Sequence, residues 1–546
     1  MTRETSSRPA QFRGLFRTDL PARAVYAEAA GIGRTLPSAV AVPTDADDVV
    51  ALVKWARSAR QALVPRGSGS SMPGGAIGRG VIVDLSRLDA IGSPDREHKR
   101  IAVGPGAIRN RVDAAARAVG LRFPVDPSSG AFCSIGGMVS TNAAGARTLR
   151  FGATRPWVAA LDCIFADGTR ATVRRGDAPP DVPAITRFMT EVATAVRAGS
   201  FERHSTLRKN SSGYALAEFA ASGELIDLLV GSEGTLAIVV GAELALTELA
   251  GATASLLAAY RSLDDAVVGT SEARQSDVTA CELIDRTFLD VAARAGPLPV
   301  PPLTESVLLI EIEGVDADDV SRRAFRLEQR LRDRGATSVV VGLDATDEDR
   351  LWELRHAASP ILSRLDPSLK SMQFIEDGVV PPDRLADYVR GVRAALAAHD
   401  VNGVIFGHAG DAHVHVNPLV DIRRSDWRER VVGILADVVD LTARLGGSLA
   451  GEHGDGSLRA PLLDRTTPQH ELDLARQVKR AFDPDGVLNP GVKVALQGQQ
   501  PIDDIKYDPD LPPLPAAAAR VLARVERERA YAQFRLDMLE HENRSE

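Results

Sequence analysis

Histidines and acidic residues gather in two glycine-containing segments of this chain. Residues 407–417 contain His408, His413 and His415, and residues 451–456 contain Glu452 and His453. Imidazoles beside carboxylates suit a borderline divalent metal ion, or a base that titrates near neutral pH. The spacing lacks the tight helical pattern of familiar zinc motifs, so a set of hydrogen-bonded or surface histidines stays open as the alternative.

An extended strand is the element that must position the first histidines. Residues 404–406 are apolar, and polar and apolar residues alternate from residue 412 onward. In β geometry this alternation places His413, His415 and Asn417 on one face. His408 lies outside the alternation, so we expect it to meet His415 only through a bulge in the strand.

Three small-residue segments in the first half of the chain predict a second kind of site. Residues 65–75 combine four glycines with three serines directly after an apolar strand. Backbone N–H groups and hydroxyls in such a loop could cradle a phosphate, and a flexible turn is the alternative. Met72 replaces the third glycine of a Rossmann loop, and Pro73 would break the helix that such a loop requires, which disfavours an NAD-binding Rossmann fold.

Two further segments of this type follow at residues 126–145 and 231–236. Small residues allow close approach of the backbone to a ligand, so three such segments indicate one extended ligand that touches several loops. Glu233 fits support of its turn better than catalysis.

Length and composition limit the class of protein. A chain of 546 residues is expected to form two or three domains. The net charge of -8, without runs of Lys or Arg, predicts no nucleic-acid partner. Three scattered cysteines exclude a cysteine-ligated iron–sulfur cluster and indicate a reducing compartment. No transmembrane or signal segment is predicted, so we expect a cytoplasmic protein, with peripheral contact to the inner face of a membrane left open.

Together, the three small-residue segments resemble the FAD-binding domain of the vanillyl-alcohol-oxidase/PCMH superfamily. Residues 351–355, 407–417, 446–454 and 482–491 resemble its D-2-hydroxyacid dehydrogenase branch, which includes D-lactate dehydrogenases, D-2-hydroxyglutarate dehydrogenases and the glycolate oxidase FAD subunit. The resemblance covers residues 20 to 495. It implies an α+β fold, with a two-subdomain PCMH-type FAD-binding domain and an α+β cap domain.

We expect four segments along the chain. The FAD-binding domain would span residues 1–248 and the cap, or substrate domain, residues 249–445. Residues 446–500 would return to the FAD site, and residues 501–546 would form a linker and a charged helix from about residue 516 to residue 540. That helix would dock on its own body, on a second subunit of a homodimer, or on a redox partner.

The resemblance implies non-covalent FAD, because residues 66–75 lack the histidine that relatives with covalent flavin often carry. The first loop would hold the pyrophosphate, the second block would line the ribityl chain and ring, and Asn489 would approach the isoalloxazine. The residues expected to bind FAD are Arg66, Gly67, Ser68, Gly69, Ser70, Ser71, Asp126, Ser129, Gly136, Gly137, Thr141, Ala143, Gly145, Glu233, Ile238 and Asn489.

For the substrate site, the resemblance implies that His408, His415 and Glu452 bind a divalent metal, zinc first and manganese or iron as alternatives. His453 would be the general base. The expected substrate contacts are Arg355, Ser359, Lys370 and Asn417. Arg355 also fits a helix surface, and the context of Lys370 matches only loosely. His413 stands where relatives carry Gly-Asn and has no assigned role, and Glu376 and Asp377 are interpreted as a solvated pair.

The expected reaction is oxidation of a D-2-hydroxyacid, D-lactate or D-2-hydroxyglutarate, to the 2-oxoacid. A histidine would take the hydroxyl proton, the metal would orient the substrate, and hydride would pass to flavin N5. We expect a separate electron acceptor, which would be a quinone, a cytochrome, an electron-transfer flavoprotein or an iron–sulfur subunit. The alternatives are a flavin-bearing electron-transfer subunit of a glycolate-oxidase-like complex and a metal-dependent hydrolase.

Overall fold

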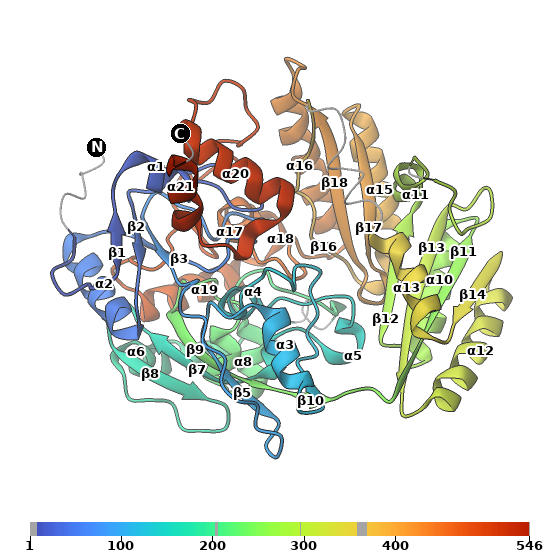
Figure 1. Ribbon diagram of the computed structural model, residues 1–546, viewed down its shortest axis with the longest axis horizontal. Helices are drawn as coiled ribbons and strands as arrows, with labels where there is room; N and C mark the ends of the chain where they lie inside the picture. Colours follow the sequence, from blue (N-terminus) through green and yellow to red (C-terminus); the bar gives the residue numbers. More distant parts are fainter. Residues whose placement is uncertain (1–7, 202–205, 295, 357–367, 545–546) are drawn as a thin grey trace.

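The computed structural model describes residues 8–201, 206–294, 296–356 and 368–544, which form two lobes (Figure 1). The first lobe contains two four-stranded sheets and is drawn in blue and teal, with the C-terminal segments packed against it. The second lobe contains one eight-stranded sheet with helices against it, drawn in yellow-green to orange. The fold class predicted from the sequence, α+β, is confirmed.

The first sheet has the order β1-β2-β4-β3, in which β2, β4 and β3 are parallel. Its strands are β1 (Leu15–Arg17), β2 (Ala39–Val42), β3 (Leu63–Arg66) and β4 (Val81–Asp84). Strands β2 and β4 are buried along their whole length, as expected for a parallel sheet covered on both faces. Helix α2 (Ala46–Ala59) contributes buried residues at helical spacing to the core beside this sheet. Strand β3 is buried at Leu63, Val64 and Arg66, so the loop that begins at residue 67 leaves the end of a largely buried strand.

The second sheet is antiparallel, with the order β5-β9-β7-β8. Its strands are β5 (Arg100–Val103), β7 (Val158–Ile164), β8 (Arg170–Arg174) and β9 (Ile238–Ala245). Helix α4 (Ile135–Thr141) begins at Ser134, whose hydroxyl accepts a hydrogen bond from the backbone N–H of Gly137. The two adjacent glycines of the second small-residue block thus lie in the first turn of a helix.

The sheet of the second lobe has the order β14-β11-β13-β12-β17-β18-β15, and β16 also pairs with β18. Its strands are β11 (Ala252–Tyr260), β12 (Ala280–Asp285), β13 (Ser306–Gly314), β14 (Ser338–Gly342), β15 (Leu369–Ser371), β16 (Gly378–Val379), β17 (Asn402–His408) and β18 (His413–Asp421). Helices α10 (Leu263–Gln275), α12 (Ala317–Asp333), α15 (Leu385–Ala398) and α16 (Trp427–Arg444) contribute to its largest hydrophobic core. Strands β17 and β18 lie inside this sheet, so side chains on them are held by a rigid element.

After α16 the chain returns to the first lobe. Helix α19 (Gln469–Phe482) ends at Phe482, whose ring packs against Phe165 and Phe188. The backbone of Leu488 then forms a parallel bridge with Leu63 of β3. Asn489 is thereby placed beside the first glycine loop.

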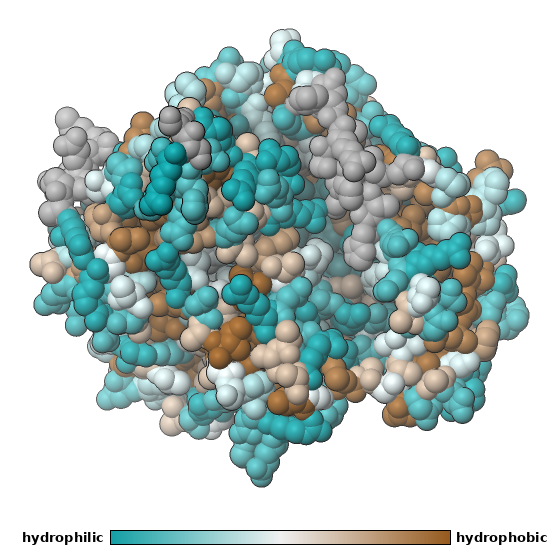
Figure 2. Space-filling view, viewed as in Figure 1, coloured by the Kyte–Doolittle hydropathy of each residue, from teal (hydrophilic) through white to brown (hydrophobic). Residues whose placement is uncertain are grey.

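The prediction of one long C-terminal helix is wrong. Two helices form, α20 (Ala516–Glu528) and α21 (Arg535–Arg544), because Arg529 adopts a left-handed conformation (φ 52°) between them. The turn lets Val521, Val525 and Leu536 share one core with residues of the first sheet. The pair docks on its own body, and its outward side is largely hydrophilic (Figure 2). None of the helices in the described part of the chain is long and apolar enough to cross a membrane.

Candidate functional site

Strands β17 and β18 form a tight hairpin that brings the histidines together. The register pairs His408 with His413 and Phe406 with His415. Directly paired residues on antiparallel strands project from the same face, so His408, His413 and His415 share that face. The predicted bulge is therefore wrong: cross-strand pairing, rather than an irregularity in β18, places His408 beside His415.

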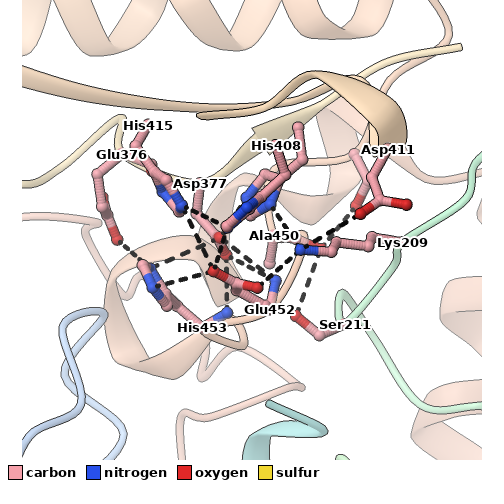
Figure 3. Close-up of polar contacts among 12 residues, drawn as sticks. Lys209, Ser211, Glu376, Asp377, His408, Asp411, His415, Ala450, Glu452 and His453 are labelled. Carbon is pink, nitrogen blue, oxygen red and sulfur yellow. Dashed lines mark hydrogen bonds and ion pairs between the residues drawn. The ribbon is translucent and has the colours of Figure 1, made fainter. Parts of the chain in front are cut away.

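Three atoms that could bind a metal converge on one point at this face (Figure 3). The Nε2 atoms of His408 and His415 lie 3.2 Å apart, and Glu452 Oε1 lies 3.3 Å and 3.4 Å from them. All three side chains are buried. Ligands about 2.1 Å from one ion stand roughly 3.0–3.4 Å apart in octahedral or tetrahedral geometry. The triangle therefore fits a single divalent ion.

The hydrogen bonds behind the two imidazoles direct their lone pairs into this triangle. His415 Nδ1 lies 2.8 Å from the carbonyl oxygen of Glu376, which only accepts, so Nδ1 carries the proton. His408 Nδ1 lies 2.6 Å from a carboxylate oxygen of Glu282. Burial would raise the pKa of Glu282, but His408 and Arg355 lower it to about 2. With Nδ1 protonated in both rings, two Nε2 lone pairs face Glu452, which is how metal-binding histidines are held.

The charge around His408 agrees with a cation at this point. Burial would lower the pKa of His408, but Glu282 and Glu452 outweigh burial and raise it. The carboxylates thus stabilise positive charge at the ring. A divalent ion bound at Nε2 would supply that charge without a second proton on the imidazole.

His413 has a different role from its neighbours. It is fully buried, and its Nε2 lies 2.8 Å from Asp377 Oδ1 while its Nδ1 lies 3.5 Å from Lys209 Nζ. Burial lowers the pKa of His413 to about 3, so the ring is neutral, donates to Asp377 and accepts from Lys209. A Cβ atom on Gly451 would lie 2.7 Å from this ring. Both ring nitrogens are engaged, so His413 holds the adjacent segment instead of binding a metal.

The interpretation of Glu376 and Asp377 as a solvated pair is wrong, because both are buried. Arg459 forms ion pairs with both carboxylates. Asp377 also accepts hydrogen bonds from the backbone N–H groups of Glu452 and His453. Burial would raise the pKa of Glu376, but Arg459 and His453 lower it to about 2. These carboxylates fix the segment at residues 451–456, so they determine where the ligand oxygen and the neighbouring imidazole lie.

His453 lies at the edge of the triangle. Its ring stacks on His415 with centroids 5.5 Å apart, and its Nε2 is 4.0 Å from Glu452 Oε1. Its Nδ1 is 3.4 Å from Glu376 and 3.6 Å from Asp377. Burial would lower the pKa of His453, but these two carboxylates raise it to about 9. A quarter of the side chain is exposed, so this imidazole is accessible from outside the cluster.

The predicted substrate residues are not all brought together. Arg355 Nε donates to Glu282 at 3.0 Å, on the carboxylate that also holds His408. Asn417 is half-buried on the face of β18 that carries His415. Lys370 lies on β15 with its Nζ 5.4 Å from the centre of the Tyr507 ring, and no described contact joins it to the triangle. Ser359 lies outside the described residues.

The first glycine loop leaves β3 in the other lobe. Arg66 is buried and donates hydrogen bonds to three backbone carbonyl oxygens, so its side chain shapes the loop. A Cβ atom on Gly67 would lie 2.1 Å from Ser134 Oγ, so the loop approaches the start of α4 only because residue 67 is glycine. Gly69 (φ 74°) follows, and the hydroxyls of Ser68 and Ser70 lie 3.1 Å apart.

The hydroxyl of Ser71 indicates that this loop fits a ligand. Its Oγ is buried and has no hydrogen-bond partner in the part of the chain that the structure describes. A buried hydroxyl without a partner costs free energy that a hydrogen-bonding ligand would recover. A phosphate group fits that requirement.

The remaining residues predicted to bind flavin belong to several loops and elements of the first lobe. They are Gly136 and Gly137 in the first turn of α4, Thr141 at its end, Asp126, Ser129, Ala143 and Gly145 in the adjoining loops, and Ile238 at the start of β9. Glu233 accepts hydrogen bonds from the backbone N–H groups of Asp455 and Gly456, at 2.7 Å and 3.0 Å. Asn489 Nδ2 donates to the carbonyl oxygens of Gly75 and Glu233. Both side chains tie loops together. Glu233 holds residues 455 and 456, which lie far from its own turn in the sequence, and the flavin contacts of both residues stay predictions.

Three buried residues near the site were not predicted. Glu282 holds His408, Arg459 holds Glu376 and Asp377, and Lys209 donates to Glu452. Glu282 stands between apolar residues on β12, Arg459 ends a short helix, and Lys209 lies in a polar run at residues 208–212. The glycines around Glu452 made that residue detectable, whereas the burial of these three charged residues leaves no comparable pattern in the sequence.

The chain belongs to the family of FAD-linked oxidases. Residues 37–174 match the family model described as "FAD binding domain". Residues 250–492 match the model described as "FAD linked oxidases, C-terminal domain". The protein is therefore an FAD-linked oxidoreductase with the PCMH-type fold that its sequence predicts.

Several curated relatives are oxidoreductases. The chain is 30% identical over 471 residues to the glycolate oxidase subunit GlcD of Bacillus subtilis, covering 86% of this chain and 91% of that one. It is 28% identical to a D-lactate dehydrogenase of Archaeoglobus fulgidus, covering 83% and 90%. It is also 28% identical to a D-2-hydroxyglutarate dehydrogenase of Pseudomonas putida, covering 92% of this chain and 53% of that one. The chain spans about half the length of this last relative.

Solved structures support the fold alone. A 4-ethylphenol oxidase from Gulosibacter chungangensis superimposes with a TM-score of 0.65 at 15% identity, covering 88% of this chain and 94% of that one. An alkyldihydroxyacetonephosphate synthase superimposes with a TM-score of 0.61 at 15% identity, covering 87% and 83%. The two-lobed arrangement is shared with both.

Proposed function

We propose that this protein oxidises a D-2-hydroxyacid, D-lactate or D-2-hydroxyglutarate, to the corresponding 2-oxoacid. The observation that carries the proposal is the triangle of His408 Nε2, His415 Nε2 and Glu452 Oε1, with edges of 3.2–3.4 Å, in an FAD-linked oxidoreductase. The names of the relatives support this substrate class. Non-covalent FAD and a divalent metal, zinc first and manganese or iron as alternatives, would be the cofactors.

His408, His415 and Glu452 would hold the metal, and the loops around Ser71, α4 and Glu233 would hold FAD. A bound divalent ion supplies a Lewis acid that lowers the pKa of the substrate hydroxyl and orients the substrate. Bound FAD supplies the acceptor for the hydride that leaves Cα.

Residues of the protein would accept the proton of the substrate hydroxyl and bind the substrate carboxylate. The carboxylates of Glu376 and Asp377 favour a proton on His453 Nδ1, which leaves Nε2 to take the hydroxyl proton. Positive charge at the triangle would lower the pKa of His453 from about 9 and favour the neutral ring that this step needs. Arg355, fixed through Nε on Glu282, would use its Nη groups on the substrate carboxylate.

A second candidate is an electron-transfer subunit of a glycolate-oxidase-like complex. It is favoured by one relative, which is itself named a subunit. Either function needs an electron acceptor, for which we propose a separate partner: a quinone, a cytochrome, an electron-transfer flavoprotein or an iron–sulfur subunit. The hydrolase alternative has no need of the FAD-binding domain that this chain contains.

Anaerobic mixing of purified protein with 2-hydroxyacids tests the proposal. We expect D-lactate or D-2-hydroxyglutarate to bleach the flavin absorbance and their L-enantiomers to leave it unchanged. Comparing acids with and without a second carboxylate identifies the substrate. A flavin that no D-2-hydroxyacid reduces would favour the electron-transfer subunit, and an unchanged reduction rate after verified metal removal would refute the role given to the triangle.

A further inference from the structure

Lys209 is a buried ammonium group that reaches the triangle from the first lobe. Its side chain is 1% exposed. Its Nζ lies 2.9 Å from Glu452 Oε2, 3.3 Å from the carbonyl oxygen of Gly145 and 3.7 Å from Asp411 Oδ2. His413 Nδ1 completes the surroundings at 3.5 Å. The ammonium group therefore has four polar partners, as a buried charge requires, and it takes no part in the proposed proton transfer or substrate contacts.

Because of Lys209, the two carboxylate oxygens of Glu452 have different partners. Oε1 faces the Nε2 atoms of His408 and His415, whereas Oε2 is held by Lys209 (Figure 3). A carboxylate that binds one ion through both oxygens must turn both toward it. To do so, Glu452 Oε2 would have to move from the position in which it accepts from the ammonium group at 2.9 Å.

We propose that Lys209 is a positioning residue that restricts Glu452 to ligation through one oxygen and so keeps coordination positions open for two substrate oxygens. The proposal rests on the proposed function, because it concerns the metal that the triangle would hold. Three protein ligands with open positions distinguish catalytic metal sites from closed structural ones. Two-oxygen ligation by Glu452 would occupy a position that a hydroxyl or carboxylate oxygen of the substrate needs.

Lys209 also places a positive charge beside the metal position. The ammonium group and a bound metal ion are both positive and would contact the same carboxylate, so they repel each other. Lys209 therefore weakens metal binding while it preserves access for the substrate. A residue with a merely structural role would have the opposite effect, since its loss would loosen Glu452 and weaken metal binding. The direction of the change in metal affinity therefore distinguishes the two roles.

Lys209→Met is the first test, with Zn²⁺ and Co²⁺ as probes and a competing chelator to measure affinity. We expect the variant to bind Zn²⁺ at least about tenfold more tightly, because the repelling charge is gone. We also expect KM to rise at least about tenfold and by a larger factor than kcat falls, because a substrate oxygen loses its position. The visible spectrum of bound Co²⁺ should change on substrate addition in the wild type and not in the variant. Weaker Zn²⁺ binding with an unchanged KM would overturn the proposal.

Lys209→Gln separates charge from geometry. Its amide N–H still donates to Glu452 Oε2 but carries no charge. We expect Zn²⁺ affinity to rise as in Lys209→Met, while KM stays within about threefold of the wild-type value. The same increase in KM in both variants would overturn the positioning role. This variant also keeps the proposal testable if Lys209→Met does not fold.

Lys493→Met is the matched control. Lys493 is also fully buried between two carboxylates, 3.0 Å from Glu233 Oε1 and 3.1 Å from Asp455 Oδ2. We expect it to lower stability without changing the Zn²⁺ affinity of the folded protein. Tighter Zn²⁺ binding in this variant too would show a general effect of removing buried charge, and would refute the specific role of Lys209.

Wild-type measurements keep this proposal separate from the proposed function. If the wild type binds no divalent ion and no D-2-hydroxyacid reduces its flavin, the proposed function fails and the role of Lys209 fails with it. If the wild type does both and the Lys209 variants show weaker Zn²⁺ binding with wild-type KM, only the role of Lys209 is refuted.

Discussion

Two buried polar clusters each contain a lysine paired with a carboxylate, yet they differ in how their polar atoms are satisfied. The triad cluster consists of the three residues of the triangle, His408, His415 and Glu452, together with Lys209. The Glu233 cluster consists of Glu233, Asp455 and Lys493, and it joins the third small-residue segment to residues 451–456. Both link segments that lie more than 200 residues apart in the chain.

Every carboxylate oxygen of the Glu233 cluster meets a donor. Glu233 accepts from two backbone N–H groups and pairs with Lys493. Asp455 accepts from the Ser212 hydroxyl at 2.8 Å and from the Gly213 N–H at 2.7 Å. In the triad cluster, Glu452 Oε1 faces two imidazole nitrogens whose protons are on the opposite side of each ring. The Glu233 cluster is satisfied by its own donors, whereas the triad cluster offers lone pairs that a cation could accept.

The same substitution in both clusters should therefore have different consequences. Glu452→Gln removes the carboxylate ligand, so we expect metal content to fall to background and the rate of flavin reduction by substrate to fall at least about 1000-fold, since a Lewis acid contributes several kcal/mol. FAD should stay bound. Metal analysis and anaerobic stopped-flow spectroscopy check this prediction, and a variant that keeps stoichiometric metal would contradict it.

Glu233→Gln should chiefly affect stability. It removes a charge that compensates buried Lys493 and turns an amide toward backbone donors, so we expect a loss of about 3 kcal/mol in the free energy of unfolding. Urea unfolding measures this loss, and Zn²⁺ affinity of the folded fraction should equal that of the wild type. A variant with wild-type stability and impaired metal binding would show that the Glu233 cluster serves metal binding and not stability.

Glu282→Gln tests the support behind the triad cluster. The substitution replaces the carboxylate that holds the His408 Nδ1 proton and Arg355 Nε. We expect metal affinity to fall roughly 10- to 100-fold, as for other outer partners of metal-binding histidines. Chelator competition checks the value. An affinity within twofold of the wild type would show that the backbone alone orients His408.

The sequence predicted the residues of both clusters that lie in short, distinctive segments. Alternation along residues 412–417 placed His413 and His415 on one face, and glycines around Glu452 marked it as a site residue. Glycines mark such places because the backbone must approach another group closely, as Gly451 approaches the His413 ring.

What the sequence could not predict are contacts between segments far apart in the chain. Asp377 appeared solvated because its partner Arg459 lies on a separate helix, and buried ion pairs leave no periodic pattern. Lys209 occupies a loop of the first lobe, so its approach to Glu452 depends on how the two lobes pack. The hairpin register that joins His408 to His415 likewise depends on the turn between two strands.

Phe132→Leu should have the smallest effect on the free energy of unfolding, and it serves as a control outside both clusters. The Phe132 ring packs against Tyr531 with centroids 5.4 Å apart, where the C-terminal helix pair meets the second small-residue segment. Leucine keeps much of the apolar contact and loses the ring interaction, so we expect about 1 kcal/mol of destabilisation in urea unfolding. Zn²⁺ affinity and the flavin reduction rate should match the wild type, because the contact involves no residue of either cluster. A change in metal affinity here as large as that in Glu282→Gln would mean that the affinity reports global packing, and the distinction between the triad cluster and the Glu233 cluster would be lost.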